Sequence, residues 1–166
     1  MATDDAETTP FMMSTAAWHA IMAIVDHLRC FRDSLITSRT PTTIETLVRS
    51  HSQYTLLQAA FENASWAVWL LASNDRVERI SRRFQVEVAS IEAVARLNAL
   101  AAKTLHPTKA DRIARLRSLA RKAGLTAAQV QESTKAVGNR EAIRGAAIAM
   151  DLDLSWPRSS GGWARA

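Results

Sequence analysis

The sequence predicts an all-α protein, and three observations support this prediction. Long stretches place apolar residues three and four positions apart, as in helices that pack along one face. Glycine is absent before Gly124, so tight hairpins and glycine-rich phosphate loops are not expected in most of the chain. No segment shows the apolar–polar alternation of a half-buried strand. We expect an antiparallel bundle of three long helices, followed by two or three short C-terminal helices.

The composition fits a single domain with a modest positive charge. Of the 166 residues, 48% are hydrophobic and 22% are charged, and the formal net charge is +5. This balance allows a buried core and excludes collagen-like and compositionally disordered chains. The single cysteine, Cys30, excludes an intrachain disulfide and a cysteine-rich zinc site. The histidines form no HExxH motif, and we expect no metal and no cofactor.

The apolar runs are too short for a membrane span, which needs about 20 apolar residues. The longest runs are residues 16–25, which His19 interrupts, and residues 64–72. The first residues are acidic and so differ from a secretory signal peptide. We expect a cytoplasmic protein that does not contact a membrane.

A first long helix is expected over residues 14–37, after a polar tail of residues 1–10 that we expect to be disordered. Pro41 prevents this helix from continuing into the next segment. Its apolar side chains recur at helical spacing and form one stripe that we expect to face the core: Trp18, Ile21, Val25, Leu28 and Leu35.

The second expected helix, over residues 43–72, has the most regular apolar pattern of the chain. Thr42 or Thr43 is expected to cap it, and Glu45 stands early in the helix, where a carboxylate suits the positive helix end. Its stripe alternates spacings of three and four residues, which predicts the seam of an antiparallel bundle: Tyr54, Leu57, Phe61, Ala64, Val68 and Leu71.

A third long helix is expected over residues 76–105 and ends before Pro107. Glu87 and Asn98 interrupt its apolar stripe, and Glu62 lies beside the seam of the second helix. We expect these three side chains to be buried polar groups. Because a buried carboxylate is costly without a partner, we expect arginine partners from a small set: Arg29, Arg32, Arg49, Arg79 or Arg83.

Short helices are expected after Pro107. One covers residues 109–123, with Gly124 as its left-handed C-terminal cap. Thr126 and Gln129 form a capping box that begins the next, and a last helix covers residues 140–150. The expected organisation is therefore a three-helix body (11–106), a basic short-helix region packed on it (107–150) and an irregular tail (151–166).

The positive charge is concentrated in residues 109–140, where eight basic residues face two acidic ones. Within this segment Ala120, Gly124 and Val130 have the spacing of a helix-turn-helix, in which a small residue, a left-handed turn and an apolar anchor let two helices cross. The alternatives are an ordinary helical corner and a solvated basic face. If nucleic acid binds here, the contacts come from the following residues: Arg112, Arg115, Arg121, Lys122, Thr126 and Gln129.

A catalytic function has few candidate residues in this sequence. His51, Glu62 and Arg49 are the candidate catalytic residues, with His51 as base and Glu62 as its orienting group. The competing interpretation is that Glu62 forms an interhelical salt bridge that fixes the packing of the helices. No G-x-S-x-G motif or glycine-rich loop is present.

The stretch from Tyr54 to Ala72, followed by Arg76, Arg79, Arg82 and Arg83, resembles a loose group of uncharacterised all-helical proteins from GC-rich, actinobacterial-type bacteria. That group is similar to HEPN-like domains, which implies a helical bundle and a setting of RNA cleavage, toxin–antitoxin pairs or phage defence. HEPN nucleases carry an arginine at a set distance before a histidine. None of the four histidines has one at that distance: His19, His27, His51 and His106.

We therefore expect a non-enzymatic helical interaction or regulatory protein. Its expected partner is a second copy or another helical protein. Trp66 and Trp69 are three residues apart and cannot both lie on the seam, so we expect one of them to pack against another helix or against a partner subunit. Trp156 and Trp163 are expected to anchor the tail onto the bundle or to contact a second copy. The first alternative is a nucleic-acid-binding regulator that uses residues 109–140. The second is a HEPN-like RNase or a component of a toxin–antitoxin or phage-defence system.

Overall fold

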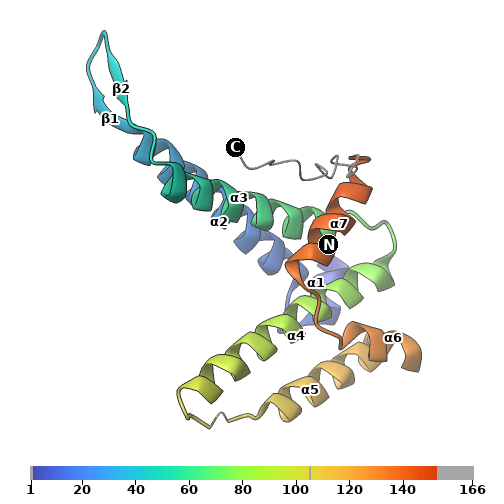
Figure 1. Ribbon diagram of the computed structural model, residues 1–166. Coiled ribbons are helices and arrows are strands. Elements are labelled where there is room, and N and C mark those ends of the chain that lie inside the picture. The colour runs from blue at the N-terminus through green and yellow to red at the C-terminus, as the bar shows by residue number, and fades with distance from the viewer. Residues whose placement is uncertain (1, 105, 153–166) are drawn as a thin grey trace, which may run out of the picture.

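The computed structural model describes residues 2–104 and 106–152 and confirms the all-α class (Figure 1). Over these residues the chain forms helices and one small antiparallel sheet. In order they are α1 (Ala2–Thr8), α2 (Met13–Leu35), β1 (Ile36–Arg39), β2 (Ile44–Thr46), α3 (Ser50–Leu71), α4 (Arg76–Leu100), α5 (Lys109–Lys122), α6 (Ala127–Ser133) and α7 (Asn139–Ala149).

The long helices do not form the expected three-helix bundle. α2 and α3 make an antiparallel hairpin, and α7 packs on α3 (Figure 1). α4 turns away from this hairpin and packs mainly on α5 and α6, which together form a second lobe. α1 lies where the two parts meet and contacts α2, α4 and α5.

The lobe of α4, α5 and α6 has its own hydrophobic core. The apolar stripe predicted for the third helix supplies Ile80, Phe84 and Ile91, which are fully buried against α5 and α6. The other buried members are Val88, Leu116, Ala120, Ala123, Leu125 and Val130. The apolar face of α4 is thus buried against α5 and α6, and α4 therefore does not cover the hairpin of α2 and α3. It ends at Leu100, earlier than expected.

The helices after Pro107 begin within a residue or two of the predicted positions, because their start signals are local, but α6 ends at Ser133, about four residues before the expected end at Gly138. Gly124 has φ +84° at the end of α5, the left-handed conformation that favours glycine. The Thr126 hydroxyl accepts from the Gln129 amide, and Gln129 Oε1 accepts from the Thr126 amide at 2.8 Å. Thr108 and Asp111 form a second capping box, which holds the pKa of the Asp111 carboxyl below its usual value through hydrogen bonds from the Thr108 hydroxyl and amide.

The helices predicted over residues 36–37 and 43–49 were wrong, because this segment is not helical. β1 and β2 pair from Ile36↔Thr46 to Arg39↔Ile44, so Thr42 and Thr43 do not cap a helix and Glu45 lies in a strand. Isoleucine and threonine dominate the segment, and β-branched side chains favour extended backbone. α3 begins only at Ser50. Buried Gln53 links the start of α3 to the segment before it, since its Nε2 donates to the Leu47 carbonyl at 2.9 Å.

Residues 2–8 form helix α1, where we expected a disordered tail. Asp4 is buried and accepts a hydrogen bond from Arg79 Nε of α4 at 2.7 Å, and this contact raises the pKa of Arg79. The Thr8 hydroxyl, also buried, donates to the Asp4 carbonyl. The order of this short polar helix comes from a partner far along the chain. Most of the expected tail, including Trp156 and Trp163, lies outside the described residues.

Close packing between α7 and α3 completes the hairpin part. Trp69 is buried in a cluster with Met13, Leu70 and Ala146, and α7 passes its indole ring at Gly145. A Cβ atom at this glycine would overlap Trp69 Cδ1 and lie 2.9 Å from Trp69 Nε1. The absence of a side chain at Gly145 therefore sets the distance between the two helices.

We expect the substitution Gly145→Ala to lower the free energy of unfolding by about 1–2 kcal/mol. Alanine normally stabilises a helix by up to about 1 kcal/mol relative to glycine, but overpacking a core costs about 1–3 kcal/mol. Urea unfolding measures the difference. Gly138→Ala is a control for an added Cβ without overlap, since this atom would meet nothing within 4 Å. Because Gly138 is the N-cap of α7, we expect a cost of at most about 1 kcal/mol there. Equal or higher stability of Gly145→Ala would mean that Trp69 can move aside without cost.

Candidate functional site

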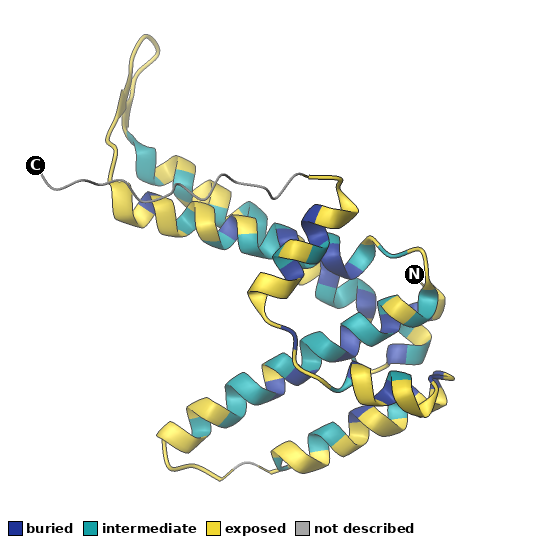
Figure 2. Ribbon diagram, turned by 45° about the vertical axis from the view of Figure 1, so that its right-hand side comes forward, coloured by how far each residue is buried: buried dark blue, intermediate teal, exposed yellow. Residues whose placement is uncertain are grey.

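The hairpin of α2 and α3 carries an exposed apolar face. Trp18 is 60% exposed on α2, and Tyr54 and Phe61 are 68% and 58% exposed on α3. All three belong to the stripes that the sequence predicted to face the core. Figure 2 shows that much of the hairpin away from α4 and α7 is exposed or only partly buried. The expectation that these stripes are buried within one chain was wrong, because no third helix of the described chain covers them.

The two stripes lie on the same side of the hairpin. Trp18 and Ile21 of α2 share an apolar groove with Leu71, the last residue of the α3 stripe. Because residues of one helical stripe project in the same direction, the rest of the α3 stripe borders this side as well. Beyond Phe61 and Val68 the surface continues onto Ile143 and Met150 at α7. We call the following residues the hairpin face: Trp18, Ile21, Leu28, Tyr54, Leu57 and Phe61.

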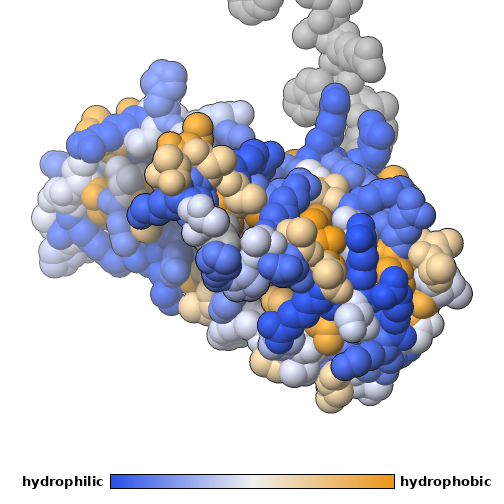
Figure 3. Space-filling model, turned by 90° about the horizontal axis from the view of Figure 1, so that it is seen from below, coloured by the Kyte–Doolittle hydropathy of each residue, from blue (hydrophilic) through white to orange (hydrophobic). Residues whose placement is uncertain are grey.

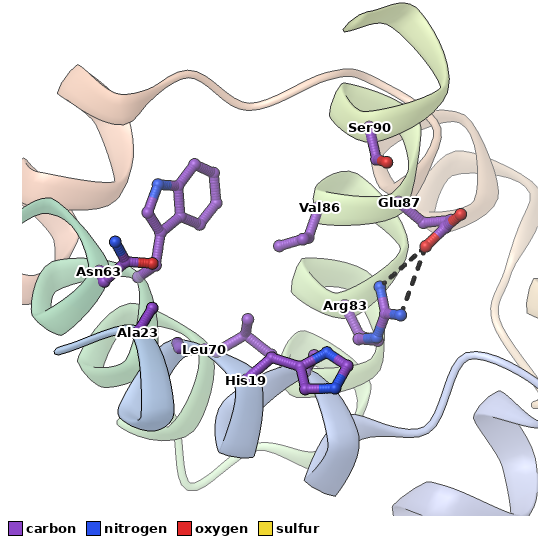
Figure 4. Close-up of a pocket in the computed structure, with 11 residues that line it drawn as sticks. His19, Ala23, Asn63, Leu70, Arg83, Val86, Glu87 and Ser90 are labelled. Atoms are coloured by element: carbon purple, nitrogen blue, oxygen red, sulfur yellow. Dashed lines mark hydrogen bonds and ion pairs between the residues drawn. The ribbon is translucent and has the colours of Figure 1, made fainter. Parts of the chain in front are cut away.

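A hollow of about 520 Å³ lies on another side of the hairpin, where α2, α3 and α4 approach one another. Figure 4 shows its labelled side chains around the opening, with Arg83 bridged to Glu87. The polar lining residues come from three helices, and the sequence pattern singled out only two of them, Arg83 and Glu87. No signal along one helix reveals such a group, because the three helices are brought together only by the tertiary fold. The polar lining consists of His19, Asn63, Arg83, Glu87 and Ser90.

Arg83 is the most perturbed charged group of the hollow. Its guanidinium is buried and lies over the Phe11 ring at 5.8 Å, and burial lowers its pKa although the Glu87 charge opposes this shift. Its hydrogen bonds to Glu87 Oε2 and to the Met12 carbonyl are long, at 3.4 Å. Arg83, one of the expected partners, thus pairs with Glu87, but through weak contacts within α4.

The candidate catalytic residues are not brought together. Arg49 and His51 are exposed at the start of α3, and Glu62 is eleven residues beyond His51, about 16 Å along the helix. Glu62 is half-buried, and Asn139 Nδ2 and Gln58 Nε2 donate to its carboxylate at 2.9 and 3.0 Å. Asn139 also accepts from Trp66 Nε1 at 3.0 Å. Glu62 therefore helps to hold α7 on α3 and does not orient a histidine.

The other expected buried polar residues are only partly buried. Glu87 borders the hollow, and Asn98 Nδ2 donates to the Val94 carbonyl of its own helix at 2.8 Å. Within residues 2–104 and 106–152, no three His, Cys, Asp or Glu side chains gather as metal ligands would. No helix among these residues combines the length and apolar character of a membrane span.

A second candidate surface is the outer side of α5. Arg115, Arg117, Arg121 and Lys122 are exposed, and none forms an ion pair with a described residue. Figure 3, a view from below, shows strongly hydrophilic side chains over the face that contains this lobe. Arg112 is half-buried, nearer the core side of the helix. We call Arg115, Arg117, Arg121 and Lys122 the basic face.

Two of the side chains expected to reach a nucleic-acid groove, Thr126 and Gln129, take part in a helix cap, whereas Gln131 of α6 is exposed. Thr126 and Gln129 bond to each other's backbone in the capping box of α6. α6 has only seven residues and carries Glu132, which pairs with Lys135. The helix-turn-helix spacing therefore produces the corner that it predicts, with Thr126 Oγ1 and Gln129 Oε1 used in the cap of α6.

The chain matches no family model, no curated protein and no solved structure. The resemblance to HEPN-like domains accordingly stays an expectation from the sequence, and the candidate sites depend on the geometry described above.

The Arg83–Glu87 pair gives a test of the electrostatics in the hollow. We expect Glu87→Gln to lower the free energy of unfolding by about 1–3 kcal/mol, because it leaves a buried guanidinium without its counter-ion. Arg83→Met is expected to cost a similar amount, because the Glu87 carboxylate, with its side chain only 17% exposed, then lacks its counter-ion. Chemical denaturation of both variants and the double variant measures the coupling. A larger loss for Arg83→Met than for Glu87→Gln would mean that the guanidinium stabilises the fold through contacts other than its pairing with Glu87.

Proposed function

We propose that this protein is a helical interaction protein that self-associates through the hairpin face. One observation carries the proposal: the apolar stripes of α2 and α3 with the clearest helical spacing are the ones that the chain leaves exposed. Monomeric proteins rarely expose contiguous apolar patches of more than a few hundred Å², and larger patches are typical of interfaces.

A second copy is the occupant that fits this face best. Two antiparallel hairpins that pack face to face make a four-helix bundle, which buries both stripes of each copy. α2 and α3 are about 34 and 33 Å long, and two helices side by side are about 20 Å wide. The face therefore offers roughly 600 Å² per copy, close to the roughly 800 Å² per partner of a standard interface.

The charge distribution supports pairing of identical copies. Across residues 13–71 four acidic residues (Asp26, Asp33, Glu45 and Glu62) balance four basic ones (Arg29, Arg32, Arg39 and Arg49). Two hairpins therefore do not repel one another through net charge, whereas two α5 helices would. The balanced charge of the hairpin therefore favours association through the hairpin face, and repulsion between the basic lobes keeps them apart.

The mass in solution tests the proposal directly. We expect sedimentation or light scattering to show a dimer, and Leu57→Glu to raise its dissociation constant at least 30-fold, about 2 kcal/mol, because a charge would be buried in the interface. Leu97→Glu is the matched control, since Leu97 is 65% exposed on α4, outside the hairpin face. A wild-type chain that stays monomeric at roughly 100 µM would contradict the proposal. So would an equal effect of both substitutions.

Cross-linking identifies the face that pairs. In an interface with twofold symmetry, the residue nearest the axis meets its own copy. With Cys30→Ser as background, we expect one of Ile21→Cys, Val25→Cys or Leu28→Cys to form a disulfide-linked dimer, and Leu97→Cys to form none. A chemical cross-link that joins the hairpin face to residues 153–166 of the same chain would show that the tail, and not a second copy, covers the face.

A further inference from the structure

We propose that the basic face of α5 binds the phosphate backbone of double-stranded DNA, without reading the base sequence. This inference goes beyond self-association and does not depend on it, because each copy carries a complete basic face. It rests on three features of the lobe: the corner between α5 and α6, the cations of α5 that form no ion pair with described residues, and the engagement of the side chains at the start of α6.

The first feature is the packing of the corner. Ala120 and Val130 are buried where α5 and α6 cross, and Gly124 makes the left-handed turn between them. α4 closes the group as the third helix of a common core. This is the arrangement by which helix-turn-helix domains hold two short helices rigidly against a duplex. A rigid lobe keeps the cations of α5 fixed relative to one another.

The second feature is that the cations are available to meet phosphate. Acidic side chains of this lobe are occupied by other partners: Asp111 caps α5, Glu92 of α4 pairs with Lys109 at 3.1 Å, and Glu132 of α6 pairs with Lys135. The four cations of the basic face cover residues 115–122, about 10 Å of helix. Duplex DNA carries one phosphate charge for about every 1.7 Å of its axis, so several phosphates fall within this length.

The third feature separates backbone contact from base reading. Thr126 Oγ1 and Gln129 Oε1 are used in the capping box, and the exposed side chains Ala127 and Ala128 carry no polar group. Gln131 is the exposed amide side chain of α6, so base contacts from this short helix are few. Base pairs are distinguished by hydrogen bonds and close apolar contacts in the grooves, whereas phosphate contacts carry no sequence information. The lobe therefore supplies the sequence-independent part of DNA recognition.

The test is the salt dependence of binding to a labelled random-sequence DNA duplex, measured by fluorescence anisotropy on the full chain. Each lost phosphate contact reduces the slope of log K against log salt by about 0.9. For the triple variant Arg115→Gln, Arg117→Gln and Arg121→Gln we expect a slope lower by about 2 to 3 and an affinity at least 30-fold weaker at low salt. These side chains are exposed, and circular dichroism checks that the variant is folded.

The matched control removes the same net charge elsewhere. Arg39→Gln, Arg49→Gln and Arg144→Gln lie on exposed positions of β1, the turn before α3, and α7, and we expect less than a threefold change. Equal losses in both triple variants would overturn the proposal, since attraction by net charge alone would explain them. Absence of wild-type binding at low salt, tighter binding to duplex RNA, or strong preference for one DNA sequence would each overturn it as well.

Discussion

A helix with a single apolar stripe can bury that stripe against only one set of neighbours, and the neighbours that α4 takes shape the whole molecule. Its buried residues Ile80, Phe84 and Ile91 pack on α5 and α6, so α4 cannot also close the hairpin of α2 and α3. Among the described residues, the hairpin is covered mainly near its inner end, where Met13 and Trp69 meet α7. Farther out, two helices lie side by side with one face that residues 2–104 and 106–152 leave exposed. Burying apolar surface is the main favourable term in folding and association, and the uncovered face is therefore the strongest indication of a partner in the molecule.

The contacts between the two parts of the chain are polar and specific rather than extensive. Asp4 binds Arg79, and the Arg82 guanidinium bonds to the Trp69 carbonyl and lies over the indole ring at 5.2 Å. Arg83 is buried beside the same junction and is held by long hydrogen bonds. A junction built from arginines on one helix fixes the direction in which α4 leaves the hairpin. Arg79, Arg82 and Arg83 belong to the arginine group on which the resemblance to HEPN-like domains depends. In this structure they contact backbone carbonyls, carboxylates and aromatic rings of their own chain.

The two proposed surfaces have different physical characters and lie on different parts of the chain. The hairpin face is apolar on an electrically balanced segment, which suits a permanent contact with an identical face. The basic face is polar, without ion pairs to described residues, and carried by a lobe with its own core. Phosphate binding is strongly dependent on salt, whereas burial of apolar side chains is not. A dimer formed through the hairpins would carry two basic faces, and contacts from both would add through a shared duplex.

Local signals in the sequence were sufficient for the helical class, for Ile80, Phe84 and Ile91 in the core of α4, and for the starts of the short helices, because periodicity and caps such as Thr126–Gln129 act within a few residues. They also marked the hairpin stripes as apolar. Tertiary packing was needed to establish that α4 leaves the hairpin, that those stripes face outward, and that His51 and Glu62 lie far apart. Residues 36–39 and 44–46 formed strands because β-branched side chains, a local signal, outweighed the helical pattern there. Helix α1 formed because Arg79 lies beside Asp4. The order of α1, the direction of α4 and the exposure of the hairpin stripes depend on contacts between residues distant in sequence. No local pattern specifies which of two apolar faces a helix will cover.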